Sequence, residues 1–240
     1  MNILSIGNSF SQDAQRYLSG IARADGVRMR TVNLMIGGCS LARHYRNMLS
    51  GDRAYTLEQN GVSTNFSVAL GEALLSDNFD AVTLQQLSSD APRIETYRPY
   101  LAELVAYVRK CQPKAKIYLQ ETWAYERDSY RLTKELGYAT ENEMTADLQN
   151  AYLAAAASLN LTGVIPSGTV FAAARALGAE KLHRDTFHAS LGLGRYLLGL
   201  TWYRKLTGRT VENNTFHDFD APVSEEEVTL AQNAVAKILP

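Results

Sequence analysis

Residues 1–11 read MNILSIGNSFS and place an apolar run directly before a turn and a helical pattern. The run at residues 2–6 has the length and apolar content of a core strand. Residues 11–24 follow with apolar or aromatic side chains at helical spacing. A strand that leads through a short turn into a helix is the basic unit of α/β proteins.

The same alternation of strand and helix continues to the end of the chain. Further strands are predicted at residues 29–36, 80–85, 116–120 and 163–166. Helices are predicted at residues 41–49, 68–75, 95–110, 140–159, 169–177, 191–206 and 225–238. Residues 53–67 are polar and are expected to be irregular. The alternation predicts a parallel sheet covered on both faces, and the lack of repeats or linkers predicts a single domain over residues 1–240.

The composition argues against several classes of function. With 24 basic and 25 acidic residues the formal net charge is -1, so no nucleic-acid partner is expected. No apolar run approaches the roughly 20 residues that span a bilayer, so no membrane partner is expected. The start of the chain lacks signal-peptide features, and we expect a cytoplasmic protein. Cys39 and Cys111 fit neither a metal-ligand spacing nor a disulfide framework and are interpreted as reduced thiols.

The turn Gly7-Asn8-Ser9-Phe10-Ser11 offers a candidate nucleophile at the end of the first strand. Gly7 permits a tight backbone there, so the Ser9 hydroxyl can be presented on a fixed turn. The helix that follows begins with unpaired N–H groups and a positive dipole end, which favour a developing oxyanion. The alternative is that Asn8 and Ser9 only cap the helix, because both residue types are strong N-caps.

The stretch Asp185-Thr186-Phe187-His188 offers an acid–base pair. A catalytic histidine needs one ring nitrogen free for the nucleophile and the other held by a carboxylate. A spacing of three residues can bring the two side chains together. The alternative is a local cap or a surface pair. His217, which is followed by Asp218, is the reserve candidate.

Two more strand ends carry groups that can donate hydrogen bonds. Gly37 and Gly38 follow the second strand, where glycines allow backbone N–H groups to approach a ligand. Gln85 and Gln86 stand at the end of the strand at residues 80–85 and offer carboxamides. Each feature alone is an ordinary turn or strand end. Together they place a serine, backbone N–H groups and an amide at successive strand ends, where α/β proteins bind ligands.

This arrangement resembles the SGNH hydrolases, also called GDSL-like lipases and esterases. Residues 7–11 are similar to the first block of that family, with Asn8 where aspartate often stands. Gly38 is similar to the glycine of the second block, and Asp185-x-x-His188 is similar to the last block. The G-N-S-F-S opening and the D-x-F-H element resemble an uncharacterised bacterial branch of the superfamily.

The third block of the family, commonly G-x-N-D, is absent. Residues 85–88 are instead similar to the Q-G-E element of carbohydrate O-acetylesterases, where a glutamine replaces that asparagine. The comparison aligns with the first glutamine. It therefore favours Gln85 as the side-chain oxyanion donor and leaves Gln86 in reserve.

The resemblance implies a three-layer α/β/α sandwich of flavodoxin-like kind with a parallel sheet of about five strands. It implies a serine esterase in which Ser9, His188 and Asp185 form a catalytic triad and a covalent acyl-enzyme is made and hydrolysed. The N–H groups of Ser9 and Gly38, with Gln85, would hold the oxyanion. Neither a metal nor an organic cofactor is implied.

The predicted substrate is a small-molecule ester, with a short acyl group, acetyl being favoured, on a sugar. Residues 123–137 leave the end of a strand and should overhang the site, where Trp123 and Tyr125 offer a wall for stacking a sugar ring. The alternative for both aromatic residues is ordinary packing, and residues 210–222 are interpreted as a surface loop. The rival function is a ligand-binding protein that kept the fold without the chemistry. A phosphate-binding turn is disfavoured, because the glycine-and-lysine pattern of a P-loop is missing.

Overall fold

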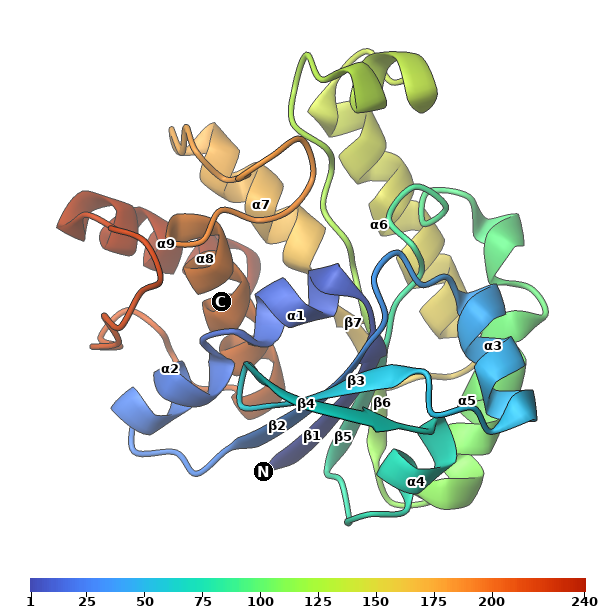
Figure 1. Ribbon diagram of the computed structural model, residues 1–240. Coiled ribbons are helices and arrows are strands. Elements are labelled where there is room, and N and C mark those ends of the chain that lie inside the picture. Colours follow the sequence, from blue (N-terminus) through green and yellow to red (C-terminus); the bar gives the residue numbers. More distant parts are fainter.

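A seven-stranded sheet runs through the middle of the protein, with helices on both faces (Figure 1). The structure is a computed structural model and describes residues 1–240. Along the sheet the strand order is β4-β3-β2-β1-β5-β6-β7. The strands are β1 (Asn2–Gly7), β2 (Arg30–Met35), β3 (Tyr55–Gln59), β4 (Val62–Val68), β5 (Ala81–Leu84), β6 (Lys116–Gln120) and β7 (Gly163–Ile165).

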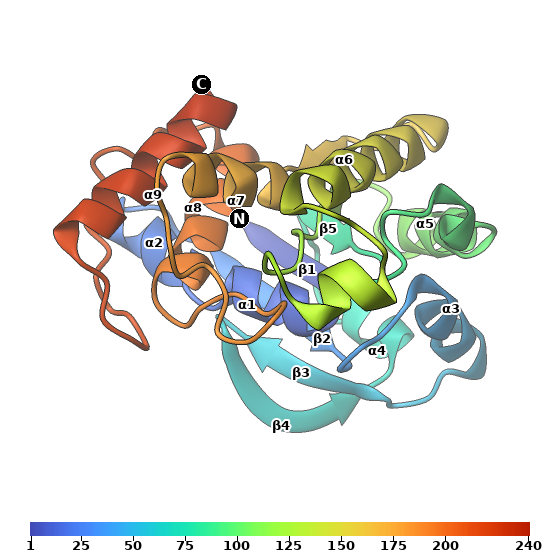
Figure 2. The same ribbon diagram turned by 90° about the horizontal axis from the view of Figure 1, so that it is seen from above.

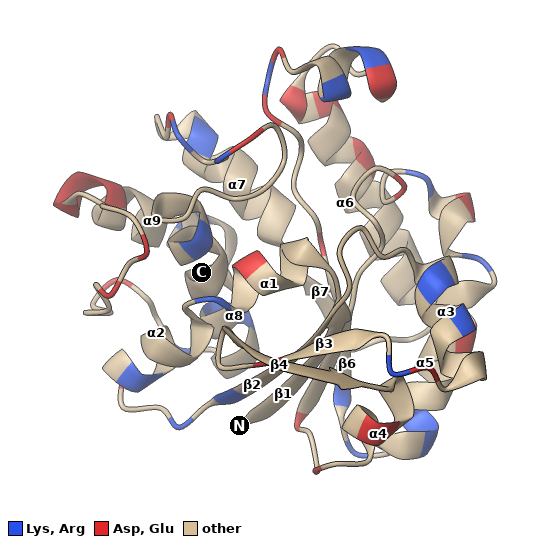
Figure 3. Cartoon of the chain, in the orientation of Figure 1, with Lys and Arg blue, Asp and Glu red and all other residues tan.

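The helices form the two outer layers of the predicted three-layer sandwich. One layer contains α1 (Ser9–Gln15), α2 (Leu18–Ala24), α7 (Ser167–Ala176), α8 (Leu193–Thr207) and α9 (Glu225–Ile238). The other contains α3 (Leu41–Ser50), α4 (Leu70–Leu74), α5 (Tyr100–Cys111) and α6 (Glu141–Ser158), with the short 3-10 helix η1 (Ile94–Tyr97). A single π-helical turn, η2 (Arg131–Glu135), lies between β6 and α6. Positions of basic and acidic residues are spread over the outer helices and loops (Figure 3).

The prediction of about five strands was wrong, because the sheet has seven. Five strands are parallel as expected, namely β2, β1, β5, β6 and β7. Residues 53–67, predicted to be irregular, form most of an antiparallel hairpin, β3–β4, at the other edge of the sheet. Its turn, Asn60-Gly61, has φ angles of 50° and 77°, the left-handed conformation typical of tight hairpins. A Cβ on Gly61 would lie 2.4 Å from the Arg16 carbonyl oxygen, so only glycine fits. β4 is an exposed edge strand, and its polar side chains led to the prediction of an irregular segment.

Two predicted helices are each divided. Residues 11–24 form α1 and α2, which are separated at Tyr17. There the Tyr17 hydroxyl donates to the Leu191 carbonyl and accepts from the Asp220 N–H. The break between the two helices is therefore held by segments that are distant in sequence. Residues 95–110 form η1 and then α5, which begins only after Pro99, a residue without the N–H that a helix interior needs.

The core is one continuous cluster of 61 buried residues on both faces of the sheet. Residues 210–222, interpreted as a surface loop, are packed against it through Phe216 and Phe219, whose rings contact Tyr17 and Tyr196. None of the helices combines the length and the apolar character that crossing a bilayer requires. The parallel register brings the carboxyl ends of β1, β2 and β5 together, and the candidate site lies there.

Candidate active site

The turn after β1 is held by the side chain of Asn8. Asn8 is the N-cap of α1, and its Oδ1 accepts from the Phe10 N–H at 2.9 Å. Its Nδ2 donates to the Cys39 carbonyl at 3.0 Å, and Oδ1 also accepts from Gln85 Nε2 at 2.6 Å. Asn8 therefore ties together the ends of β1, β2 and β5. Because Asn8 performs the capping, the hydroxyl of Ser9, the first residue of α1, is left for another partner.

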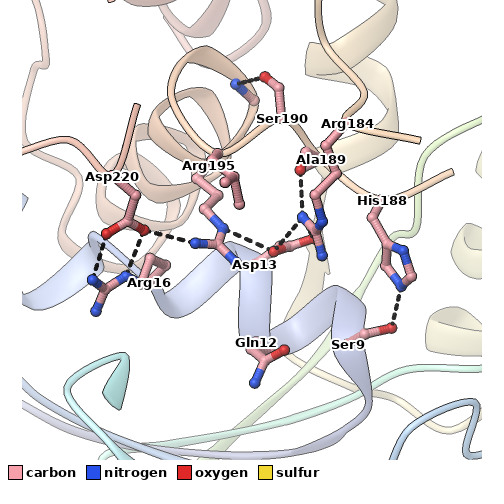
Figure 4. A network of polar contacts seen from close by, with 12 residues as sticks. Ser9, Gln12, Asp13, Arg16, Arg184, His188, Ala189, Ser190, Arg195 and Asp220 are labelled. Carbon is pink, nitrogen blue, oxygen red and sulfur yellow. Dashed lines mark hydrogen bonds and ion pairs between the residues drawn. The ribbon is translucent and has the colours of Figure 1, made fainter. Parts of the chain in front are cut away.

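That partner is His188, in the loop between α7 and α8 (Figure 4). The Ser9 Oγ lies 2.9 Å from His188 Nε2, and His188 Nδ1 lies 2.7 Å from Asp185 Oδ2. Asp185 Oδ1 accepts the backbone N–H groups of Phe187 and His188, at 2.9 and 2.8 Å. The structure thus brings together three residues from opposite ends of the chain in one hydrogen-bonded line.

The electrostatics of the Asp185 carboxyl favour its charged form. Partial burial alone would raise its pKa, but the two backbone N–H groups and the His188 imidazole outweigh this and lower the pKa to about 2. A carboxylate can only accept hydrogen bonds, so Nδ1 of His188 must carry the proton that points at Asp185. In the neutral imidazole, His188 Nε2 is then left as an acceptor for the Ser9 hydroxyl. This is the protonation state that a general base requires.

The backbone N–H groups of Ser9 and Gly38 follow the neighbouring parallel strands β1 and β2. Neither the Ser9 N–H nor the Gly38 N–H donates a hydrogen bond within the protein. Gly38 is exposed and has a φ angle of 60°, a conformation that glycine adopts without strain. The expectation that these two N–H groups lie at neighbouring strand ends agrees with the geometry. Their part in catalysis belongs to the proposal below.

The two glutamines after β5 have different surroundings. Gln85 is buried, and its hydrogen bond to Asn8 is the only one its carboxamide makes. Gln86 is also buried, and its Oε1 accepts from the N–H groups of Leu41 and Leu87 while its Nε2 donates to Thr96. Gln86 is therefore fully occupied in joining three segments. Gln85 supports the turn that carries Ser9, and its role as an oxyanion donor stays a prediction.

This difference predicts opposite effects for the two glutamines. Gln85→Ala removes the amide that fixes Asn8 behind Ser9, and it should lower kcat by about 100-fold with little change in KM. Gln86→Ala leaves the N–H groups of Leu41 and Leu87 without their acceptor, so it should cost about 2 kcal/mol of stability while kcat falls less than about tenfold. Steady-state kinetics and thermal unfolding of both variants check this. A wild-type kcat in Gln85→Ala would exclude any contribution of Gln85 to the site.

The prediction that Trp123 and Tyr125 form a sugar-stacking wall was wrong, because both side chains are buried, at 0% and 3% exposure. The Trp123 ring stacks on Phe10 with centroids 4.2 Å apart, and its Nε1 donates to the Phe187 carbonyl at 2.8 Å. The Tyr125 hydroxyl pairs with Ser88. Residues 123–137 nevertheless lie beside the loop that carries His188, as Figure 2 shows. The Glu126 N–H donates to the Thr186 carbonyl of that loop.

The other histidines do not reach Ser9. His217, the reserve candidate, is on an exposed stretch, and its Nδ1 contacts the Thr215 carbonyl. His44 is buried beside Tyr55, and burial lowers its pKa to about 3. His183 contacts the Ala124 carbonyl. His188 is therefore the histidine that the fold places at the candidate nucleophile.

The sequence analysis did not identify Asp13, whose buried carboxylate lies beside the candidate site. Asp13 has 0% side-chain exposure and pairs with Arg184 and Arg195. The available signals were its position four residues after Ser9, on the same face of a helix, and the position of Arg184 directly before Asp185. Neither pattern indicates that residues 171 positions apart meet.

Residues 2–238 match the family model described as a domain of unknown function, DUF4886. The chain belongs to this family. A crystal structure of a DUF4886 family protein from Bacteroides uniformis is similar to this DUF4886 protein at a TM-score of 0.92 and 31% identity, covering 99% of this chain and 93% of that one. No curated protein matches the chain.

More distant solved structures identify the fold of this DUF4886 protein. A protein from Slackia heliotrinireducens, described as a candidate SGNH hydrolase, has a TM-score of 0.61 at 22% identity, covering 86% of this chain and 98% of that one. An acetylxylan esterase from Geobacillus stearothermophilus has a TM-score of 0.53 at 17% identity, covering 86% and 94%. The fold is that of the SGNH hydrolases, as the motifs in the sequence predicted.

Proposed function

We propose that this DUF4886 protein is a serine esterase that hydrolyses short acyl esters, with an acetyl group on a carbohydrate as the favoured substrate. The observation that carries the proposal is the line from Ser9 Oγ through the His188 imidazole to the Asp185 carboxylate. Its distances of 2.9 and 2.7 Å are those of formed hydrogen bonds. A nucleophile, a base and a group that orients the base are therefore within reach of one another.

In the first half of the proposed reaction, His188 Nε2 takes the proton of Ser9 as Ser9 Oγ attacks the ester carbonyl carbon. Asp185 stabilises the imidazolium that forms. The carbonyl oxygen becomes an oxyanion, which the free N–H groups of Ser9 and Gly38 would bind at the positive end of α1. The tetrahedral intermediate collapses, the alcohol leaves with the proton from His188, and Ser9 carries the acyl group.

In the second half, water replaces the alcohol. His188 takes a proton from the water, whose oxygen attacks the acyl carbon and forms a second oxyanion in the same place. Collapse of this intermediate releases the carboxylic acid and returns the proton to Ser9. The cycle balances without any further reactant.

The proposed substrate class has separate support. The stretch at residues 85–88 resembles an element of carbohydrate O-acetylesterases, and a protein of similar fold is an acetylxylan esterase. Because Trp123 and Tyr125 are buried, a sugar would have to be recognised by other groups around Ser9.

A panel of esters tests the proposal. Purified protein should hydrolyse p-nitrophenyl acetate faster than the butyrate, and the butyrate faster than the octanoate, and it should release acetate from acetylated xylo-oligosaccharides. Ser9→Ala protein serves as the matched control for contaminating esterases. Absence of turnover on every ester would favour the rival function, a ligand-binding protein that kept this fold.

A further inference from the structure

A buried carboxylate lies one helical turn behind the candidate nucleophile. Asp13 and Ser9 share a face of α1, and the Asp13 side chain is completely buried. Arg184 Nη1 lies 2.9 and 2.8 Å from its two oxygens, and Arg195 Nε lies 2.9 Å from Oδ1 (Figure 4). A buried carboxylate is strongly disfavoured without such partners, so Asp13 holds both guanidinium groups in place.

Arg184 connects this carboxylate to the loop that carries His188. It directly precedes Asp185, and the nitrogen that contacts Asp13 also donates to the Ala189 carbonyl. The Arg184 backbone N–H donates to the His188 carbonyl at 3.0 Å. The Arg184 side chain thus joins α1 to the carbonyl of Ala189, the residue after His188, while its backbone joins the two ends of the stretch from Asp185 to His188.

The loop also has contacts that do not involve the Arg184 side chain, among them the Phe187 ring against Phe10 and Tyr125. The side chains of Asp185 and His188 are 45% and 20% exposed, and the His188 ring lies against the Phe187 ring with centroids 4.0 Å apart. On the opposite side, Trp123 Nε1 binds the Phe187 carbonyl and the Glu126 N–H binds the Thr186 carbonyl. Loss of Arg184 should therefore let the loop shift rather than detach.

We propose that Arg184 is a positioning residue that, through Asp13, fixes the distance between His188 Nε2 and Ser9 Oγ. The proposal rests on the proposed esterase function and adds a residue that does not touch the substrate. Its physical basis is that proton transfer from Ser9 needs a formed hydrogen bond, and a misplacement of about 1 Å can cost about 100-fold in rate. The link joins the helix of the nucleophile directly to the loop of the base.

Arg195 provides a matched control. It pairs with the same Asp13 carboxylate, but it comes from α8, and its other ion pair is with Asp220, away from the His188 loop. When either arginine is replaced, Asp13 still pairs with the other arginine. A purely structural role of the ion pairs should therefore give Arg184→Met and Arg195→Met similar defects, whereas a positioning role should separate them.

The experiment compares wild type, Arg184→Met, Arg184→Lys and Arg195→Met by kcat and KM on p-nitrophenyl acetate, by Tm, and by the rate at which a fluorophosphonate probe labels Ser9. In Arg184→Met we expect kcat and the labelling rate to fall by about 30- to 100-fold, with KM changed less than about threefold. Arg195→Met should lose a similar amount of Tm and keep kcat within about threefold. Arg184→Lys should recover to within about tenfold of wild type, because an ammonium offers three donors at one nitrogen.

Equal losses of kcat in Arg184→Met and Arg195→Met, or an Arg184→Met protein that loses only Tm, would overturn the proposal and leave the esterase function standing. A wild-type protein that neither turns over esters nor is labelled would remove both. If Arg184→Met does not fold, Arg184→Gln takes its place, because glutamine is too short to join Asp13 to the loop. Wild-type kcat in Arg184→Gln would overturn the proposal.

Discussion

Ser9→Ala should lower kcat for p-nitrophenyl acetate by at least about a thousandfold, because triad residues act as a unit. The Ser9 hydroxyl is the one that contacts His188 Nε2, so its removal leaves the base without a nucleophile to activate. The N–H groups of Ser9 and Gly38 remain, and the residual rate should reflect their binding of the oxyanion by itself. KM should change little, since the hydroxyl contributes to the transition state rather than to binding of the ester.

Ser11→Ala is the matched control for this variant. Ser11 lies in the same turn, but its hydroxyl is buried and lies 2.8 Å from both the Asn8 carbonyl and Asn33 Oδ1, either of which can accept its proton. Its loss should reduce stability by about 1 kcal/mol and kcat by less than about tenfold. Near wild-type turnover in pure Ser9→Ala protein would rule out a covalent mechanism at this residue.

Asp185→Asn should lower kcat by about 10⁴-fold while the fold stays intact. The asparagine Oδ1 can still accept the N–H groups of Phe187 and His188, but the NH₂ group would face His188 Nδ1. Nδ1 must then become the acceptor, which moves the imidazole proton to Nε2, so His188 can no longer take the proton of Ser9. Because the pKa of Asp185 is lowered to about 2, Asp185 is a carboxylate throughout the neutral range and can accept the Nδ1 proton of His188.

Asp218→Asn tests whether the effect is specific. Asp218 adjoins His217, the reserve histidine, and that pair lies away from Ser9. Kinetics at matched protein concentration should give Asp218→Asn the kcat of wild type. A reversal, with Asp185→Asn active and Asp218→Asn inactive, would show that the wrong histidine was assigned to the base.

The parts of the fold that were predictable have strong local signals. The strand at residues 116–120 and the helix at residues 225–238 were predicted with the bounds that the structure shows. That helix begins with a reciprocal cap between Ser224 and Glu227, a pattern that is local in sequence. The β3–β4 hairpin was missed although Asn60-Gly61 is a strong turn signal and residues 62–68, VSTNFSV, alternate in the manner of a strand. The polar content of residues 53–67 was interpreted as an irregular segment instead.

The candidate site likewise has a part that the sequence could predict and a part that it could not. Asp185 and His188 are three residues apart and form their own hydrogen bonds, so the sequence suffices to pair them. Whether Trp123 faces a ligand or the core depends on Phe10 and Phe171, which stack on its two sides from distant segments. The contact between Asp13 and Arg184 likewise depends on the tertiary fold, so no local sequence pattern indicates it.

The central claim is that Ser9 is a nucleophile activated by His188, and covalent labelling with a fluorophosphonate tests it most directly. The probe forms a bond between Ser9 Oγ and phosphorus with loss of fluoride, so intact-protein mass spectrometry should show one adduct per chain. Peptide mapping should place the adduct on Ser9, and labelling should disappear in Ser9→Ala and slow strongly in Asp185→Asn. An adduct on another residue, or equal labelling of wild type and Ser9→Ala, would contradict the account.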